Sequence, residues 1–276
     1  MDRSCLKHKK RIVIKVGSSS ITHENGDLYL SRIEKLVRVL CDLRAQGKDV
    51  VLVSSGAIAC GRRALHIGRR PESTAEKQAF AAVGQARLMM VYQRLFSEYN
   101  MVASQILLTK NIMREKHARE NARNTFLELF ALQSIPIVNE NDTISTHELL
   151  EVESFGDNDQ LASTVGSLIG ADLIILLSDI EGLYTDNPKT NPKAQLIRHV
   201  SHIDQTLLNM GTNESSSNVG TGGMSAKLVA AQIAMDAGAD LVIAKFEEGI
   251  VTRILQGQQA GTYFCANVNG IASLLS

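Results

Sequence analysis

The sequence has few cysteines, no excess of charge of either sign and no long apolar run. Its 4 cysteines are widely spaced and form no Cys-x-x-Cys pair, which argues against a zinc site or a secreted disulfide scaffold and favours a reducing cytoplasm. The 29 basic residues balance 29 acidic ones, so no overall field attracts nucleic acid or an anionic membrane. No run approaches the roughly 18 apolar residues of a membrane span, and no signal-peptide core is present near the start. We therefore expect a cytoplasmic protein without nucleic-acid or membrane partners.

The histidines also indicate neither a metal site nor a catalytic triad. The 7 histidines show no metal-ligand spacing, and nothing resembles a Ser-His-Asp arrangement. The one basic cluster, Lys7–Arg11, directly precedes the first expected strand and lacks interleaved aromatic residues. A solvated lead-in to that strand is favoured over an RNA or membrane contact.

The pattern of short β-rich runs between longer helical segments indicates an α/β fold. With 276 residues and 44% hydrophobic content, the chain can bury a core as one large domain or as two small ones. Strands that alternate with helices imply crossover connections, hence a mostly parallel central sheet in a three-layer αβα sandwich. The expected strands are Arg11–Val16, Asp49–Ser54, Val102–Leu108, Ile135–Asn139, Asp172–Ser178 and Asp240–Lys245.

The spacing of apolar residues predicts helices in the segments between these strands. In Ser31–Gln46 five apolar residues recur on one face, and Gly47 suits the end of that helix. The five are Ile33, Leu36, Val37, Leu40 and Leu43. Further helices are expected at Ser73–Tyr99, Ala118–Leu132, Leu161–Ile169 and Ser225–Ala237.

Two lysines are embedded in glycine and small hydroxyl residues. Lys15 emerges at a strand end and is followed by Gly17 and three serines, whereas Lys227 closes the glycine-rich stretch that begins at Gly220. Backbone N–H groups freed by glycine, hydroxyl donors and a lysine charge together suit a phosphate group. Neither loop has the Walker order of glycines and lysine, so another scaffold must hold any nucleotide.

Three more polar clusters follow strands or open a helix. Ser54–Gly56, Asn139–Asp142 and Ser178–Asp179 each come at or just after the end of an expected strand, where ligands bind in open α/β sheets. Asn139–Asp142 could instead be a turn built from Asx side chains. Phe155–Asp159 opens a helix, and ordinary N-capping explains one of its three polar residues. Ser215–Asn218 favours a mobile lid over a domain boundary.

These blocks in this order resemble the amino acid kinase family, and within it the glutamate-directed branch. The resemblance spans nearly the whole chain. It rests on Ile14–Ser19, Ser54–Ile58, Lys77–Gln85, Pro136–Asp142, Phe155–Asp159 and Gly220–Lys227. It implies an enzyme that uses ATP and Mg²⁺ to phosphorylate the side-chain carboxylate of L-glutamate, the first step of proline biosynthesis, with proline as a possible feedback inhibitor.

The resemblance also implies roles for individual residues. Lys15, Lys227 and Asp159 match the catalytic positions, with Asp159 organising the two lysines. Ser55, Asp142 and Asn158 match the glutamate-binding positions. The nucleotide-binding positions are matched by Lys15, Ser178, Asp179, Thr221, Gly222, Gly223, Met224, Ser225, Ala226 and Lys227. No metal-ligating residue is implied. A carboxylate acceptor is already ionised at neutral pH, so no general base is required.

Several alternatives remain open at this stage. These blocks could also belong to a sister kinase that acts on N-acetylglutamate, aspartate or a nucleoside monophosphate. They could also belong to a non-catalytic regulator that senses glutamate or proline. We expect a single amino acid kinase domain over residues 1–276, without the C-terminal RNA-binding-like domain of many relatives. The segment Lys245–Gly249 lacks the usual glycine-rich turn, which leaves the base-binding edge unassigned. The apolar surface of Ser73–Tyr99 favours a homo-oligomer, although a helix enclosed within its own domain explains it nearly as well.

Overall fold

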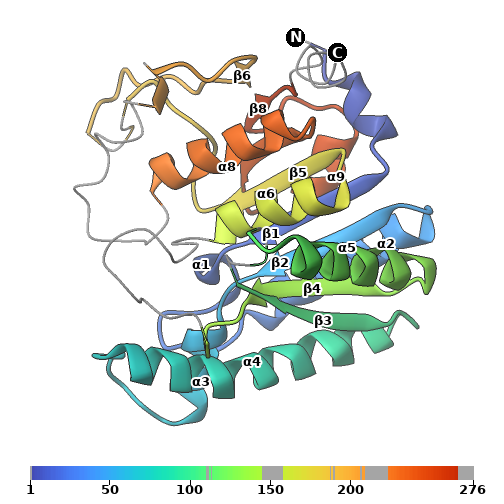
Figure 1. The fold of residues 1–276 in the computed structure, drawn as a ribbon. Coiled ribbons are helices and arrows are strands. Elements are labelled where there is room, and N and C mark those ends of the chain that lie inside the picture. Colours follow the sequence, from blue (N-terminus) through green and yellow to red (C-terminus); the bar gives the residue numbers. More distant parts are fainter. Residues whose placement is uncertain are drawn as a thin grey trace. The chain divides into compact units, whose positions relative to one another are not determined.

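The computed structural model describes two compact α/β units (Figure 1). One unit comprises Met1–Lys15 and Asp159–Ser276, and the other Val16–Asn158. The residues described are 2–109, 112, 114–144, 158–186, 188, 190–205, 207–208 and 223–266. The expectation of a single domain over residues 1–276 stays a prediction.

The Val16–Asn158 unit is built on three parallel strands in the order β3-β4-β2. Strand β2 (Asp49–Ser54) is buried along nearly its whole length, as is β4 (Ile135–Glu140), whereas the edge strand β3 (Ala103–Leu108) is partly exposed. Its helices are α1 (Ser18–Ile21), α2 (Leu30–Ala45), α3 (Ala57–Ala64), α4 (Thr74–Ser97) and α5 (Lys116–Ala131). The carboxyl ends of β2 and β4 carry the polar clusters expected from the sequence.

The apolar face predicted for the first long helix is confirmed. All five of its predicted members are buried in α2, and this helix packs against β2 and α4. Helix α3 approaches α4 backbone to backbone, because a Cβ on Gly84 would lie 1.7 Å from the Ala57 carbonyl oxygen and one on Gly61 would lie 1.8 Å from that of Phe80. No side chain fits at either position, so this helix pair depends on both glycines.

The second unit contains strands β1, β5, β7, β8 and β6 in that order. Their bounds are β1 (Arg11–Val16), β5 (Leu173–Ser178), β6 (His199–Val200), β7 (Asp240–Lys245) and β8 (Thr262–Phe264). Parallel pairing joins β5 to β7 and β6 to β8, whereas β8 is antiparallel to β7. Its helices are η1 (Ser4–His8), α6 (Asn158–Ile169), α8 (Met224–Asp236) and α9 (Ile250–Leu255).

The predicted α/β class, with a mostly parallel sheet flanked by helices, is confirmed. Strand β5 is buried at every position, as expected for a parallel strand covered on both faces. The antiparallel strand β8 and the two-residue strand β6 were not predicted, because their runs are too short to show a period. No helix among the described residues is long and apolar enough to cross a membrane.

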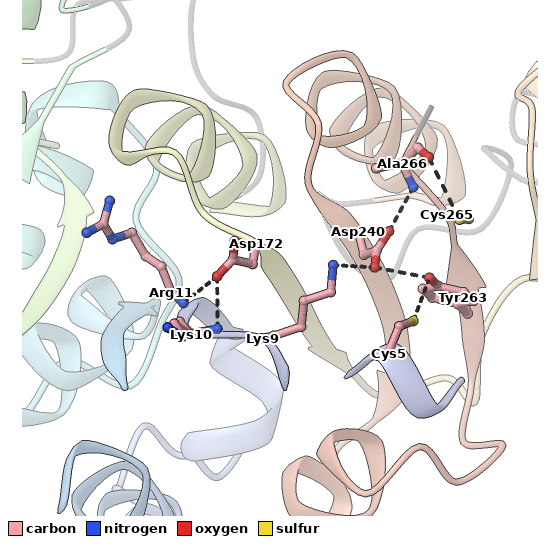
Figure 2. A network of polar contacts seen from close by, with 9 residues as sticks. All are labelled: Cys5, Lys9, Lys10, Arg11, Asp172, Asp240, Tyr263, Cys265 and Ala266. Carbon is pink, nitrogen blue, oxygen red and sulfur yellow. Dashed lines mark hydrogen bonds and ion pairs between the residues drawn. The ribbon is translucent and has the colours of Figure 1, made fainter. Parts of the chain in front are cut away.

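A polar network ties the N-terminal segment to the starts of β5 and β7 (Figure 2). Asp240 accepts hydrogen bonds from the Tyr263 hydroxyl at 3.0 Å and the Ala266 amide at 2.8 Å, and pairs with the Lys9 ammonium at 2.7 Å. Asp172 accepts from the backbone amides of Lys10 and Arg11, both at 2.8 Å. The two aspartates therefore hold the segment that leads into β1, the strand that carries Lys15.

Replacing Asp240 tests how far this network stabilises the fold. Asp240→Ala removes the carboxylate that pairs with the partly buried Lys9 ammonium and accepts two hydrogen bonds. We expect the free energy of unfolding, measured by urea titration, to fall by about 2–3 kcal/mol. Asp236→Ala, at an exposed position on α8, serves as the control and should stay within about 0.5 kcal/mol. Equal stabilities of the two variants would contradict the assigned role of Asp240.

Candidate functional site

The two predicted lysines meet one buried carboxylate. The Lys15 ammonium lies 2.6 Å from Oδ1 of Asp159, and the Lys227 ammonium lies 2.8 Å from Oδ2. The side chain of Lys15 is only 5% exposed, that of Lys227 7% and that of Asp159 1%. Each comes from a different element: β1 supplies Lys15, while the first turns of α6 and α8 supply Asp159 and Lys227. We refer to these three residues as the charge triad.

The electrostatics of the triad favour an ionised carboxylate. Burial, the largest influence on the Asp159 carboxyl, works toward a higher pKa, but the charges of Lys15 and Lys227 outweigh it and lower the pKa below its ordinary value. Two ammonium groups and one carboxylate give a net charge of +1 in a site that water scarcely reaches. A phosphate anion would be attracted to such a site, since electrostatic interactions strengthen where water is excluded.

The predicted nucleotide-binding residues that the structure describes lie in the same unit as the triad. Gly223 precedes α8, whose first three residues are Met224, Ser225 and Ala226, so the positive end of the helix dipole lies next to Lys227. Thr221 and Gly222 fall outside the described residues.

Ser178 and Asp179 lie at the carboxyl end of β5. Ser178 is the last residue of the strand, and its hydroxyl donates to the Asp179 carboxylate at 3.1 Å. In the parallel register Ser178 stands opposite Lys245, the last residue of β7. These positions agree with the expectation that strand ends supply ligand-binding residues.

Two of the predicted glutamate-binding residues are joined by a hydrogen bond within the Val16–Asn158 unit. The side-chain amide of Asn158 donates to the Ser55 hydroxyl at 2.8 Å and to the Ser54 carbonyl at 3.3 Å. Ser55 occupies the turn between β2 and α3, and Gly56 provides the left-handed conformation (φ 104°) that this turn requires.

Asp142, the third predicted glutamate-binding residue, follows β4 and is half-buried. Burial, reinforced by the neighbouring Glu140, raises the pKa of its carboxyl to about 6. A carboxylate in that environment would be stabilised by a cationic ligand group. No contact of Asp142 with Ser55 or Asn158 is among the interactions of the described residues.

Sequence reasoning assigned no individual role to three further residues of this hydrogen-bond network, although Asn139 belongs to the predicted polar cluster Asn139–Asp142. The Asn139 amide oxygen accepts from Asn158 at 3.0 Å, and its amide group donates to Gln85 at 2.9 Å. Tyr92 shares a hydrogen bond of 2.9 Å with the Ser54 hydroxyl, and burial raises the pKa of its phenol. Gln85 and Tyr92 belong to α4, for which the sequence indicated only a long helix with apolar surface. The available clue was that Gln85 ends the Lys77–Gln85 block on which the family resemblance partly rests.

Some predicted features fall outside the described residues: Phe155–Asp157, Gly220 and the possible lid at Ser215–Asn218. Among the residues that the structure does describe, no group of three or more histidine, cysteine, aspartate or glutamate side chains could hold a metal ion.

The fold and the charge triad define a class of protein, and comparison with known proteins identifies it. Residues 10–245 match the model of the amino acid kinase family. The chain belongs to this family.

Similar curated proteins carry a more specific name, glutamate 5-kinase. The protein of that name from Clostridium perfringens is 46% identical over 96% of this chain and 98% of its own length. That from Enterococcus faecalis is 43% identical over 95% and 97%. The Carboxydothermus hydrogenoformans protein is 44% identical over 95% of this chain but only 69% of its own length.

Solved structures with the same fold are more distant in sequence. UMP kinase from Bacillus anthracis superposes with a TM-score of 0.62 at 17% identity, covering 94% of this chain and 97% of that one. UMP kinase from Ureaplasma parvum gives 0.61 at 14% identity, with 93% and 99% covered. Identities this low establish the fold alone.

The triad makes a stability prediction for Asp159→Asn. Removing the carboxylate breaks the ion pairs of two buried ammonium groups, so we expect the free energy of unfolding at pH 7 to fall by about 3–5 kcal/mol. Because the Asp159 pKa is lowered in the folded state, its contribution is fully present above the unfolded value of about 3.9 and is lost as pH falls through the lower folded value. Urea titrations at several pH values should therefore show the gap between wild type and variant closing at acid pH. A gap that is independent of pH would contradict the ion pairs.

Proposed function

We propose that the chain is an ATP-dependent kinase that phosphorylates the γ-carboxylate of L-glutamate to L-glutamyl 5-phosphate, the first step of proline biosynthesis. The observation that carries this proposal is the charge triad, found in a chain that is 43–46% identical to several proteins named glutamate 5-kinase. Phosphoryl transfer requires positioning and charge stabilisation above all, and the triad offers buried positive charge for that purpose.

The chemistry needs no general base. One oxygen of the ionised γ-carboxylate forms a bond to the γ-phosphorus of ATP, while the bond from that phosphorus to the bridging β–γ oxygen breaks and ADP leaves. In this scheme Lys15 and Lys227 stabilise charge on the transferring phosphoryl oxygens. Asp159 keeps the two ammonium groups together despite their mutual repulsion, so that the positive charge is in place before reaction begins.

The remaining predicted residues take binding roles in this proposal. The helix start at Gly223–Ala226, together with Thr221, Gly222, Ser178 and Asp179, binds the nucleotide. Ser55, Asp142 and Asn158 bind glutamate, with Asp142 pairing with its α-ammonium group. Mg²⁺ enters as part of the MgATP substrate, because this ion keeps several waters and binds largely through substrate phosphates.

The proposal extends to context. The cysteine usage supports a cytoplasmic location, the apolar surface of α4 supports a homo-oligomeric state, and the family resemblance implies proline as a feedback inhibitor. Within α4, Phe80, Leu88, Met89 and Tyr92 are buried inside the chain, whereas Val83 is 36% exposed and Met90 is 67% exposed. The exposed pair provides part of the apolar surface that an oligomer would cover.

Hydroxamate formation tests the reaction. Purified protein with ATP, Mg²⁺ and hydroxylamine should convert glutamate, but not N-acetylglutamate or aspartate, to a hydroxamate at a substantial rate. N-acetylglutamate has no ammonium group for Asp142, and the shorter aspartate places its carboxylate out of reach of the phosphoryl group. A kcat/KM for N-acetylglutamate equal to that for glutamate would favour the sister kinase. No product with any acid would favour a non-catalytic regulator.

Lys227→Ala tests the role of the triad in this reaction. The kcat for glutamate should fall by roughly 10²–10³, the usual effect of removing one preorganised electrostatic group, with little change in the KM for glutamate. Lys15→Ala should behave alike, and the double variant should lose less than the sum of the two free energies because both lysines act on one phosphoryl group. An unchanged kcat would remove Lys227 from the mechanism.

Asp142 makes a pH prediction. Because its pKa is raised to about 6, the carboxyl becomes neutral below that pH and can no longer pair with an ammonium group. The kcat/KM for glutamate should therefore decline as pH falls from 8 through about 6, since this parameter reports ionisations of the free enzyme. Asp142→Asn should have a lower kcat/KM at pH 8 and should lack the decline near pH 6. An identical pH profile in both proteins would contradict the pairing.

A further inference from the structure

Four amide and hydroxyl side chains of the Val16–Asn158 unit form a continuous hydrogen-bond relay. Asn139 donates to the Gln85 side-chain oxygen at 2.9 Å, Asn158 donates to the Asn139 side-chain oxygen at 3.0 Å, and Asn158 also donates to Ser55 at 2.8 Å. Gln85 is 9% exposed and Asn139 is 4% exposed, so their polar groups have little access to water. We call these four residues the amide relay.

Two backbone groups fix the direction of the relay. The Glu140 amide, which can only donate, bonds to the Asn139 side-chain oxygen at 2.9 Å. The Ser54 carbonyl, which can only accept, receives a bond from the Asn158 side-chain nitrogen at 3.3 Å. Asn139 must therefore turn its NH₂ group toward Gln85, and Asn158 must turn its NH₂ group toward Ser54, Ser55 and Asn139.

The direction of the relay determines what Asn158 can offer a ligand. Its NH₂ group has two N–H donors, and three acceptors already surround them. Its side-chain oxygen forms no hydrogen bond among the interactions of the described residues. The atom left for a ligand is thus an acceptor, which suits a cationic N–H group and disfavours another acceptor such as a carboxylate oxygen.

The backbone groups set which way the two asparagine amides face, and Gln85 holds the Asn139 side chain in position at the α4 end. The Gln85 side-chain oxygen is the acceptor for the NH₂ group of Asn139, and without it that buried group would lose its partner. The close packing of α3 on α4 through Gly84 and Gly61 leaves little freedom for the position of α4 beside this site.

We propose that Gln85 is a positioning residue that, through Asn139, holds Asn158 in place so that the Asn158 side-chain oxygen can accept a hydrogen bond from an acceptor substrate with a free ammonium group. This inference rests on the proposed glutamate kinase activity and adds to it a contribution to α-ammonium selectivity beyond the pairing with Asp142. Gln85 itself touches no substrate in this scheme.

The test compares two substrates that differ only in the ammonium group, L-glutamate and glutarate. Gln85→Leu and Gln85→Met, which remove the acceptor at similar volume, should lower the ratio of kcat/KM for glutamate to that for glutarate about tenfold, mostly through the KM for glutamate. The KM for ATP should be unchanged. Gln85→Glu keeps an oxygen acceptor and should retain most of the ratio. Gln93→Leu, at an exposed position on the same helix, is the matched control and should retain all of it.

The ratio separates positioning from general structural damage, because a loss of active protein lowers both rates equally and cancels. A ratio that is unchanged in Gln85→Leu and Gln85→Met, while wild type phosphorylates glutamate, overturns the relay and leaves the proposed function intact. Wild-type protein that phosphorylates neither acid overturns both. Retention of the ratio by Gln85→Glu but not by Gln85→Leu supports the relay.

Discussion

The ion pairs of Asp159 with Lys15 and Lys227 are the interaction on which the candidate site depends. Two ammonium groups at this depth repel each other and lose hydration, and the carboxylate between them offsets both costs. Each carboxylate oxygen pairs with one lysine. Because two ammonium groups face one carboxylate, the triad has a net positive charge. The fold delivers its members from a strand and from two helix starts, all within one compact unit.

The first two residues of α6 have different partners and different roles in the proposed chemistry. Asn158 and Asp159 are consecutive residues, yet Asn158 bonds to Ser55 and Asn139 while Asp159 pairs with the lysines. The first therefore serves the acceptor substrate in our proposal and the second the phosphoryl group. Other contacts support these residues. Asp172 and Asp240 bind the segment before β1, and Gln85 accepts a hydrogen bond from Asn139 in the amide relay.

Much of the fold could be predicted because buried parallel strands are continuous apolar runs and α2 shows a clear helical period. Strands β1, β2 and β7 begin and end at the predicted residues. The triad could be predicted as a group only from the family resemblance, since lysines at 15 and 227 and an aspartate at 159 have no local signal for their meeting. The amide relay was missed because Gln85 lies within an apolar helix and its partner, Asn139, is 54 residues away. Contacts of that range arise from packing, which periodicity does not report.

The most direct test of the account follows an oxygen atom. Glutamate labelled with ¹⁸O in the side-chain carboxylate is incubated with the protein, MgATP and hydroxylamine, and the released inorganic phosphate is examined by ³¹P nuclear magnetic resonance. If the γ-carboxylate attacks the γ-phosphorus, the bridging oxygen leaves with phosphate when hydroxylamine attacks the acyl carbon, so each phosphate carries one ¹⁸O. Phosphate without ¹⁸O, at a rate matching ADP formation, would show that ATP is hydrolysed without carboxylate phosphorylation and would contradict the account.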